Sequence, residues 1–293
     1  MQVTVKVPGS CGELIQGITG DINFLVTCPV DCYSVVSMKK NNTKKISINI
    51  PGKIKLLSAV KETLSFFNLD QNSGYEVMLK SDLPIGKGMA SSTADMTGAI
   101  IATGILNDKV LTEKEISQIL LKIEPSDGIF YSGIVAFDHI NGSFYEKVGE
   151  AFPAHFLIFD YGGEVDTIKF NSDPDLEKKN LQKKPIIEKA YSLIKESFID
   201  KDIKKLGEAI TLSSLENQGI LFKDNLEEII EISLSKGAYG INVAHSGTLI
   251  GILNDENTKL EELAEEILNK YSNLTCLGNF KMVDGGYEYV IRR

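Results

Sequence analysis

Arginine is almost missing from this chain of 293 residues, since only Arg292 and Arg293, at its C-terminal end, carry a guanidinium group. Every internal positive charge is therefore a lysine. Because arginine gives bidentate recognition of phosphate and carboxylate groups, an anionic substrate must be held by lysines, hydroxyls and backbone N–H groups unless the tail folds back. The body of the chain also supplies no arginine finger for phosphoryl transfer.

Cysteine and long apolar runs are scarce as well. The four cysteines, Cys11, Cys28, Cys32 and Cys276, are too few and too irregularly spaced for a disulfide framework, which favours a reducing compartment. No stretch reaches the roughly eighteen uninterrupted apolar residues of a membrane span. Residues 1–8 lack the basic start and the apolar run of a signal peptide. We therefore expect a cytoplasmic protein.

The charge balance is acidic, with a net charge of -9 and a pI near 5.0. Such a chain offers no broad basic surface to nucleic acid or to an anionic membrane, so neither is an expected partner. Its length and ordinary apolar content suit one large domain or two smaller ones. We expect small-molecule partners and leave the oligomeric state open between a monomer and a homodimer.

Strand and helix patterns interleave along the chain, which predicts an α+β or mixed α/β fold. Alternating or β-branched segments predict strands at residues 3–7, 33–38, 46–50, 75–80, 155–160, 241–244, 249–253, 279–283 and 287–292. Helical spacing of apolar residues predicts helices at residues 54–67, 91–106, 112–125, 185–199, 202–216, 225–236 and 258–271.

Turn and charge signals divide the chain further. Asn141-Gly142 predicts a β-hairpin. The polar run at residues 171–184 predicts an exposed excursion between two halves. We place the boundary near Phe152, which gives an N-terminal domain of residues 1–152 and a C-terminal domain of residues 153–293.

A glycine-containing segment, residues 83–94, leads directly into the predicted helix at 91–106. Gly86 and Gly88 leave little side chain in the way of a ligand, and the first turn of a helix carries free N–H groups. Successive backbone donors at a helix N-terminus suit a triphosphate, and the hydroxyls of residues 91–93 suit phosphate or Mg²⁺. The simpler alternative is a helix N-cap behind a tight loop.

The full string of this segment resembles the phosphate loop of the GHMP kinases. Its pattern Pro-x-x-x-Gly-x-x-Ser-Ser-x-Ala is met by Pro84, Gly88, Ser91, Ser92 and Ala94. Leucine and glycine are usual where this chain has Met89 and Ala90. A Walker A loop and the protein-kinase motifs are absent. The resemblance implies that ATP is bound by Pro84, Ile85, Gly86, Lys87, Gly88, Met89, Ala90, Ser91, Ser92, Thr93, Ala94, Ser246 and Gly247.

Two further segments match other motifs of this family in the family's order. Residues 8–17 are similar to the first motif of one branch, the L-threonine kinases of cobalamin side-chain synthesis and propanediol utilisation, and residues 86–95 look like the same branch. Residues 240–248 resemble the family's C-terminal glycine motif. The resemblance implies the GHMP kinase fold, with an N-terminal domain like ribosomal protein S5 domain 2 followed by a ferredoxin-like C-terminal domain.

For function, the resemblance implies an ATP- and Mg²⁺-dependent kinase that phosphorylates the side-chain hydroxyl of free L-threonine to O-phospho-L-threonine, a precursor of the adenosylcobalamin side chain. Homoserine or another small alcohol stays open as the acceptor, because acceptor choice depends on pocket contacts that a fold does not define. A metabolite- or nucleotide-binding regulator without turnover is a third reading, disfavoured by the presence of Ser91, Ser92 and Asp127.

The resemblance also implies individual roles. Ser92 is the expected Mg²⁺ ligand, and Glu124 is preferred to Glu115 as the second ligand because Glu115 also fits a helix capping box. Asp127 is the expected catalytic base, against the alternative of a turn aspartate. Candidate contacts for the amino acid substrate are Ser10, Glu13, Gln16, Asp127 and His245. Strand-end, turn or buried structural positions explain most of these residues equally well.

Overall fold

The computed structural model describes residues 1–166, 170 and 174–293, and these form an eleven-stranded sheet. The path through the sheet is β10-β7-β9-β8-β1-β2-β4-β3, with β11 beside β1, β5 beside β2 and β6 beside β5. The strands are β1 (Gln2–Thr19), β2 (Ile22–Asn41), β3 (Ile46–Ile48), β4 (Gly74–Ser81), β5 (Ile134–Phe137), β6 (Tyr145–Gly149), β7 (His155–Asp160), β8 (Gly240–Val243), β9 (Leu249–Asn254), β10 (Thr275–Lys281) and β11 (Glu288–Arg292).

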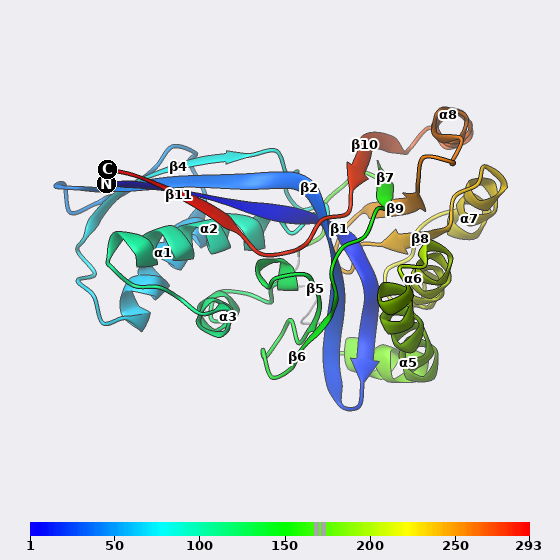
Figure 1. The fold of residues 1–293 in the computed structure, drawn as a ribbon, viewed down its shortest axis with the longest axis horizontal. Helices are drawn as coiled ribbons and strands as arrows, with labels where there is room; N and C mark the ends of the chain where they lie inside the picture. The colour runs from blue at the N-terminus through cyan, green and yellow to red at the C-terminus, as the bar shows by residue number, and fades with distance from the viewer. Residues whose placement is uncertain (167–169, 171–173) are drawn as a thin grey trace.

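The long antiparallel hairpin of β1 and β2 joins the two halves of the molecule (Figure 1). From Gln2 to Val7 half-buried and buried residues alternate, which is typical of a sheet with one covered face. From Val7 to Ile18 every residue is buried, because helices pack on this part of the strand as well. Register shifts at Pro8/Gly9 and at Ser10/Glu13 bend the strand within that buried stretch.

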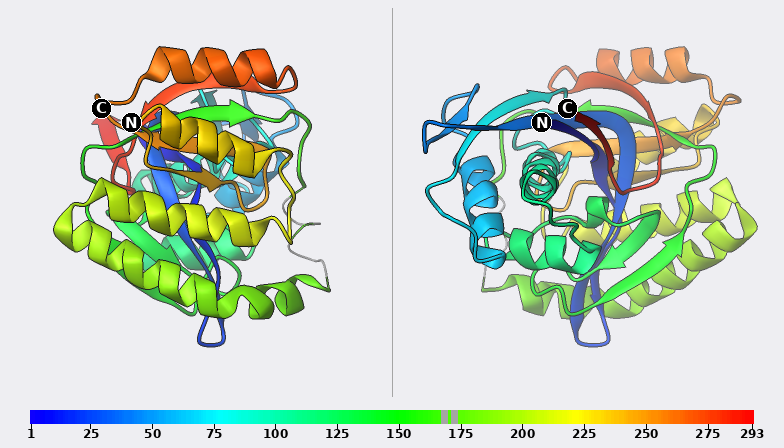
Figure 2. Two further views of the ribbon diagram at one scale, coloured as in Figure 1. Left: turned by 90° about the vertical axis from the view of Figure 1, so that its right-hand side faces the viewer. Right: turned by 60° about the vertical axis from the view of Figure 1, so that its left-hand side comes forward.

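Helices cover the sheet in two groups: α1 (Ile54–Phe66), α2 (Ser91–Leu106) and α3 (Glu113–Leu121) in the N-terminal half, and α5 (Leu176–Asp200), α6 (Ile203–Asn217), α7 (Leu226–Ser235) and α8 (Leu260–Lys270) in the C-terminal half. The central helix α2 is buried almost all round and packs on β1 and β2. In Figure 2, α5 and α6 lie side by side, and both pack on β1.

Most predicted elements are confirmed to within a few residues at each end. Helix α2 has the predicted bounds, and β5 and β6 pair antiparallel on either side of Asn141-Gly142. The predicted capping box is present: the Thr112 side chain accepts from the backbone N–H of Glu115, whose own side chain accepts from the backbone N–H of Thr112. Local signals were sufficient for these elements.

The prediction of an exposed excursion at residues 171–184 is wrong from Leu176 onward, because α5 begins there. Residues 171–173 lie outside the described residues. Leu176, Asn180 and Lys183 are all buried, and their spacings of four and three residues place them on one face of the helix. A lysine and an asparagine on the buried face conceal the helical pattern from a reading based on apolar residues.

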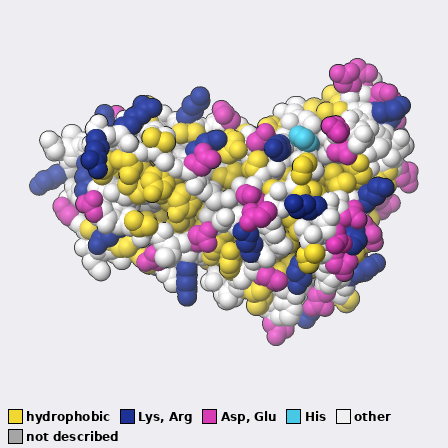
Figure 3. Space-filling model, in the orientation of Figure 1, with side chains coloured by type: hydrophobic (Ala, Val, Ile, Leu, Met, Phe, Trp, Pro, Cys, Tyr) yellow, Lys and Arg dark blue, Asp and Glu magenta, His cyan; other side chains and the backbone are white. Residues whose placement is uncertain are grey.

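The two termini lie next to each other (Figure 1), because β11 pairs antiparallel with β1 in a register that opposes Arg292 to Gln2. The last strand therefore returns to the N-terminal half, and the division near Phe152 stays a prediction. On the face drawn in Figure 3, lysines and arginines are interspersed with acidic side chains. Of the helices formed by the described residues, none combines the length and apolar character that crossing a bilayer requires.

Candidate active site

Three segments far apart in the sequence meet at the start of α2. The backbone N–H of Gly12, on β1, donates to the carbonyl of Gly88 at 3.2 Å, and that of Ser10 donates to the carbonyl of Met89 at 3.1 Å. From the other side, the N–H of Thr248 donates to the carbonyl of Lys87 at 2.9 Å. The three motifs singled out in the sequence are thus joined by main-chain hydrogen bonds.

Glycine is required where these segments touch. Gly88 has φ of +96°, and a Cβ on it would come within 2.4 Å of the Ala244 Cβ. A Cβ on Gly247 would come within 2.2 Å of the Lys87 carbonyl oxygen. Both distances are shorter than atoms tolerate, so any larger residue would push the two loops apart.

A cavity of about 500 Å³ lies beside this junction. It is lined by Leu25, Lys55, Ile85, Gly86, Gly88, Met89, Ala90, Ser91, Ser92, Thr93, Glu124, Pro125, Ser126, Asp127, His139, Glu164, Val165, Asp166, His245 and Ser246. Helix α2 begins at its wall, behind Ala90 in a left-handed conformation, and no side chain of the described residues caps the helix. The N–H groups of its first turn are therefore available to an anion in the cavity.

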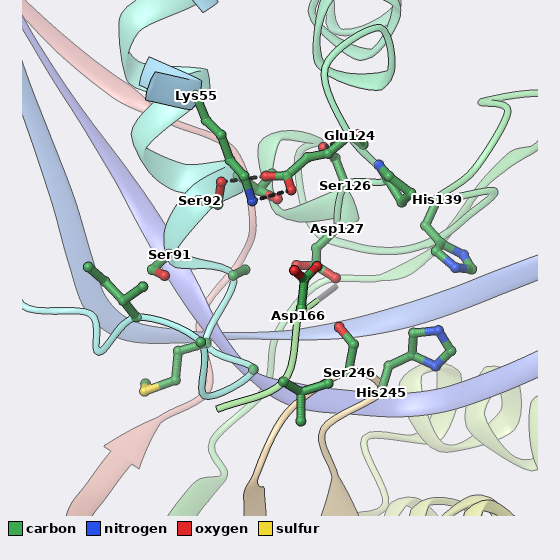
Figure 4. A pocket seen from close by; sticks show the side chains of 18 of the residues that line it. Lys55, Ser91, Ser92, Glu124, Ser126, Asp127, His139, Asp166, His245 and Ser246 are labelled. Atoms are coloured by element: carbon green, nitrogen blue, oxygen red, sulfur yellow. Dashed lines mark hydrogen bonds and ion pairs between the residues drawn. The ribbon is translucent and has the colours of Figure 1, made fainter. Parts of the chain in front are cut away.

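Ser92 and Glu124 contact each other in the wall of the cavity. The Ser92 Oγ donates a hydrogen bond to Oε1 of Glu124, and the Lys55 Nζ, from α1, lies 2.5 Å from Oε2 of Glu124. The glutamate is buried, whereas the Lys55 side chain is 46% exposed. A hydroxyl, a carboxylate and an ammonium group are thus gathered at the start of α2 (Figure 4).

Asp127 follows Glu124 by three residues and lines the same cavity (Figure 4). Burial, reinforced by the negative charge of Glu124, raises the pKa of Asp127 to about 6. The neighbouring carboxyl of Glu13, on β1, is buried as well, and burial together with the charge of Asp127 holds the pKa of Glu13 well above its ordinary value. The pKa values of both carboxyls are therefore raised, by burial first and then by the negative charge of a neighbouring carboxyl.

His245 lines the opposite part of the cavity and is held as a neutral imidazole. Burial, assisted by the charges of His139 and Lys183, holds the pKa of His245 well below its ordinary value. The Gln16 amide donates through Nε2 to the Val243 carbonyl at 3.3 Å, so its Oε1 faces the His245 Nδ1 at 2.9 Å as an acceptor. This network places the proton of His245 on Nδ1. Its Nε2 is a buried acceptor without a hydrogen-bond partner among the described residues.

Two family models match the chain: the GHMP kinases N terminal domain over residues 54–134 and the GHMP kinases C terminal domain over residues 190–273. The L-threonine kinase of Salmonella typhimurium is 30% identical over 97% of this chain and 94% of its own length. The chain belongs to the GHMP kinase family. A second relative, the L-threonine kinase of Citrobacter freundii, is 31% identical over 86% of each chain.

Solved structures agree with this GHMP kinase assignment. The homoserine kinase of Cytophaga hutchinsonii superposes with a TM-score of 0.72 at 14% identity, covering 99% of this chain and 97% of its own. The Methanococcus jannaschii mevalonate kinase superposes with a TM-score of 0.69 at 18% identity, covering 96% and 98%. At such identities the likeness shows the fold alone, and the predicted GHMP kinase fold is confirmed. Kinase relatives imply the use of ATP and of a small-molecule acceptor.

The residues predicted for the site of this GHMP kinase fall into two groups. Those that line the cavity are Ile85, Gly86, Gly88, Met89, Ala90, Ser91, Ser92, Thr93, Glu124, Asp127, His245 and Ser246. Those that do not line the cavity are Ser10, Glu13, Gln16, Pro84, Lys87, Ala94 and Gly247. Glu115 is engaged in the capping box of α3 and does not line the cavity.

Sequence reasoning missed several residues at the cavity of this GHMP kinase. Lys55 is brought to Glu124 by the packing of α1 against α2, and no local pattern distinguishes it from other lysines. His139 lines the cavity and lies edge-on to His245 with ring centroids 5.1 Å apart. Lys183, which lies behind the cavity wall and does not line it, belongs to the segment predicted to be exposed, and only its place on the buried face of α5 marks it.

Proposed function

We propose that this GHMP kinase transfers the γ-phosphoryl group of ATP to the side-chain hydroxyl of free L-threonine, giving O-phospho-L-threonine and ADP. The observation that carries the proposal is Asp127, a carboxyl of raised pKa in the same cavity as the uncapped start of α2 and the Ser92–Glu124 pair. Two relatives named L-threonine kinase, 30% and 31% identical over most of the chain, support threonine as the acceptor.

ATP would lie with its phosphates against residues 84–94 and the Ser246-Gly247 turn. The backbone donors of the first turn of α2 and the positive end of its dipole suit the β- and γ-phosphates. The hydroxyls of Ser91 and Thr93 add further donors in the same wall. Because these groups are fixed by main-chain bonds between three segments, they need little rearrangement to receive the nucleotide.

Mg²⁺ fits the oxygen donors of this wall. The Ser92 hydroxyl and the Glu124 carboxylate touch each other, and hard oxygen ligands of this kind suit Mg²⁺. Lys55 already balances the charge of Glu124, and its half-exposed ammonium is free to move away when another cation arrives. Bound there, the ion would neutralise charge on the transferring phosphoryl group.

Asp127 is the proposed base. With a pKa of about 6 it is mostly ionised at neutral pH and still basic enough to take a proton from an attacking hydroxyl. As the hydroxyl oxygen bonds to the γ-phosphorus, its proton passes to Asp127 and the bond from the γ-phosphorus to the bridging oxygen breaks, releasing ADP. The Glu13 carboxyl, whose pKa burial holds well above its ordinary value, hydrogen-bonds Asp127 and so helps to hold it in place.

The test is ADP release by the purified protein with ATP and Mg²⁺, comparing L-threonine, D-threonine, L-serine and L-homoserine. We expect L-threonine to give the highest kcat/KM. A preference for homoserine would keep the phosphoryl-transfer site and refute the acceptor. ATP binding without turnover on any of the four would refute the kinase proposal and favour a nucleotide-binding regulator.

A further inference from the structure

A cluster of buried polar side chains lies behind the part of the cavity wall that His245 lines, here called the acceptor side because the phosphate acceptor is proposed to bind there. The Lys183 Nζ, on α5, lies 3.4 Å from the Asn217 Oδ1, on α6, and both residues are buried, at 4% and 0% exposure. Lys183 makes no ion pair among the described residues, and Glu216 acts on its charge only from a distance. The Asn217 Nδ2 has no acceptor in that part of the chain either. Two donors thus end in the protein interior with their hydrogen-bonding capacity unfilled.

The contacts of β1 place this cluster next to the cavity. The Ser213 Oγ, one turn before Asn217 on α6, accepts from the backbone N–H of Gln16 at 3.1 Å, and the Gln16 side chain bonds His245 in the cavity wall. On α5, the Ile187 side chain, one turn after Lys183, lies 3.0 Å from the position of a Cβ on Gly17. The helices that carry Lys183 and Asn217 therefore contact Gln16 and Gly17 of β1, and the Gln16 side chain in turn supports His245.

A buried ammonium group is costly unless an anion neutralises it. Burial lowers the pKa of Lys183 to about 8, which reflects that missing partner. Lys223, the other deeply buried lysine with a pKa lowered to about 8, differs because its Nζ donates to the Gly247 carbonyl at 2.9 Å. Among the described residues, the Lys183 Nζ has only the longer contact of 3.4 Å with the Asn217 Oδ1.

The other cations near the cavity are already engaged. Lys55 lies beside Glu124 and Ser92, in the wall proposed for Mg²⁺ and the phosphates, and Lys87 pairs with Asp160 at 2.8 Å. The two arginines lie at the end of the chain, where β11 meets the start of β1. Among the described residues that surround the acceptor side, Lys183 is therefore the cation available to an anionic group of the substrate.

We propose that Lys183 and Asn217 bind the carboxylate of the amino acid acceptor. The two donors match the two oxygens of a carboxylate. The unpartnered Nε2 of His245 can accept a hydrogen bond from the ammonium group of the same molecule. This arrangement selects a free amino acid over a simple alcohol, and it leaves the side-chain hydroxyl for Asp127. The inference rests on the proposed function, because it deepens the acceptor choice of that site.

The experiment compares L-threonine with L-threoninamide, which has a neutral group in place of the carboxylate. The variants are Lys183→Met, which removes the charge at similar length, and Asn217→Asp, which supplies an internal carboxylate to Lys183. The matched control is Lys184→Met, the same change on the neighbouring residue, whose Nζ bonds the Gly20 carbonyl near the surface. Steady-state kinetics and titration calorimetry of both acceptors, with a non-hydrolysable ATP analogue in the calorimeter, give the readouts.

We expect each of the two variants to lower kcat/KM for L-threonine about 100-fold, mainly through KM, and to change the value for L-threoninamide less than about threefold. The control variant Lys184→Met should keep the wild-type preference for L-threonine over L-threoninamide. Both variants should also melt at or above the wild-type temperature, because the unpaired buried charge is removed or neutralised. If the variants bind L-threonine more weakly but are as stable as wild type, Lys183 and Asn217 contact the substrate. A purely structural role would lower the stability as well.

Three results would overturn the inference, and they can be told apart. If wild-type protein prefers L-threonine to the amide and the variants keep that preference, the carboxylate lies elsewhere and the kinase proposal stands. An equal loss for the acid and the amide also removes the carboxylate assignment, because it marks Lys183 as structural. If wild-type protein neither binds nor phosphorylates L-threonine, the proposed function fails and the inference falls with it.

Discussion

The Ser92 hydroxyl donates a hydrogen bond to the Glu124 carboxylate and so links the first turn of α2 to the loop that follows α3. These residues are separated by 32 positions in the sequence. Their contact places a hydroxyl and a carboxylate at one point of the cavity wall, beside the uncapped helix N-terminus. Most expectations about catalysis depend on this contact and on its neighbour Asp127.

Glu124→Gln should lower kcat by on the order of 100-fold and raise the Mg²⁺ concentration needed for half-maximal rate, because it removes the negative charge next to Ser92. Kinetics over a range of Mg²⁺ concentrations at saturating ATP provide the measurement. Glu115→Gln is the matched control, because that side chain only completes the capping box of α3. Equal effects of the two changes would reject Glu124 as the metal-binding carboxylate.

Asp127→Asn should lower kcat about 100-fold or more, the usual contribution of a general base. Since the pKa of Asp127 is raised to about 6, wild-type kcat/KM should decline as the pH falls below that value and Asp127 gains a proton. The residual activity of the variant should lack this decline. An acidic limb that persists unchanged in Asp127→Asn would assign the titration to a different group, such as Glu13 or the substrate.

The same carboxyl should destabilise the protein at high pH. The folded-state pKa of Asp127 lies above its ordinary value of 3.8, so its protonated form is favoured by folding, and this contribution is lost as the pH rises through about 6. Asp127→Asn should therefore unfold at a temperature a few degrees higher than wild type near about pH 8, with a smaller gap near about pH 5. Thermal unfolding by circular dichroism at both pH values checks the sign, and a gap that widens toward acid would contradict it.

Gly88→Ala should destabilise the protein by about 2–4 kcal/mol and weaken ATP binding, because the new Cβ would lie 2.4 Å from that of Ala244 in addition to straining a backbone at φ +96°. Gly52→Ala is the control for strain alone, at φ +81° with no atom within 4 Å of the added Cβ. Gly52→Ala should lower the free energy of unfolding by about 1 kcal/mol. Similar losses in both variants would mean that the contact between loops is unimportant.

Thr112→Ala should lower the free energy of unfolding by about 1 kcal/mol, through loss of the cap of α3, and leave kcat unchanged. Urea denaturation and the ADP-release assay measure the two quantities on the same preparation. A large loss of activity at full stability would instead connect the Thr112–Glu115 pair to the site and reopen Glu115 as a ligand.

The sequence by itself determined the elements whose signals are local. The proline, glycines and serines of residues 84–94 define a loop and the helix start behind it, and α2 has the bounds that its apolar composition predicts. The capping box at Thr112 and Glu115 needs only residues three positions apart. Family resemblance added the fold, because three motifs occur along the chain in the order that the family has. Each of these signals lies within one short stretch of sequence.

Only the tertiary structure decided which side chains share the cavity. Glu13 meets Asp127, and Lys55 meets Glu124, through the packing of a strand and a helix that lie far away in the sequence. The burial of Lys183 shows most clearly why the sequence alone could not identify these residues. Lysine is ordinarily a solvent-exposed residue, and Pro185 suggests a helix start, so the local reading places Lys183 outside the core. Its burial follows from the face that α5 presents to β1 and α6, which no pattern of single residues encodes.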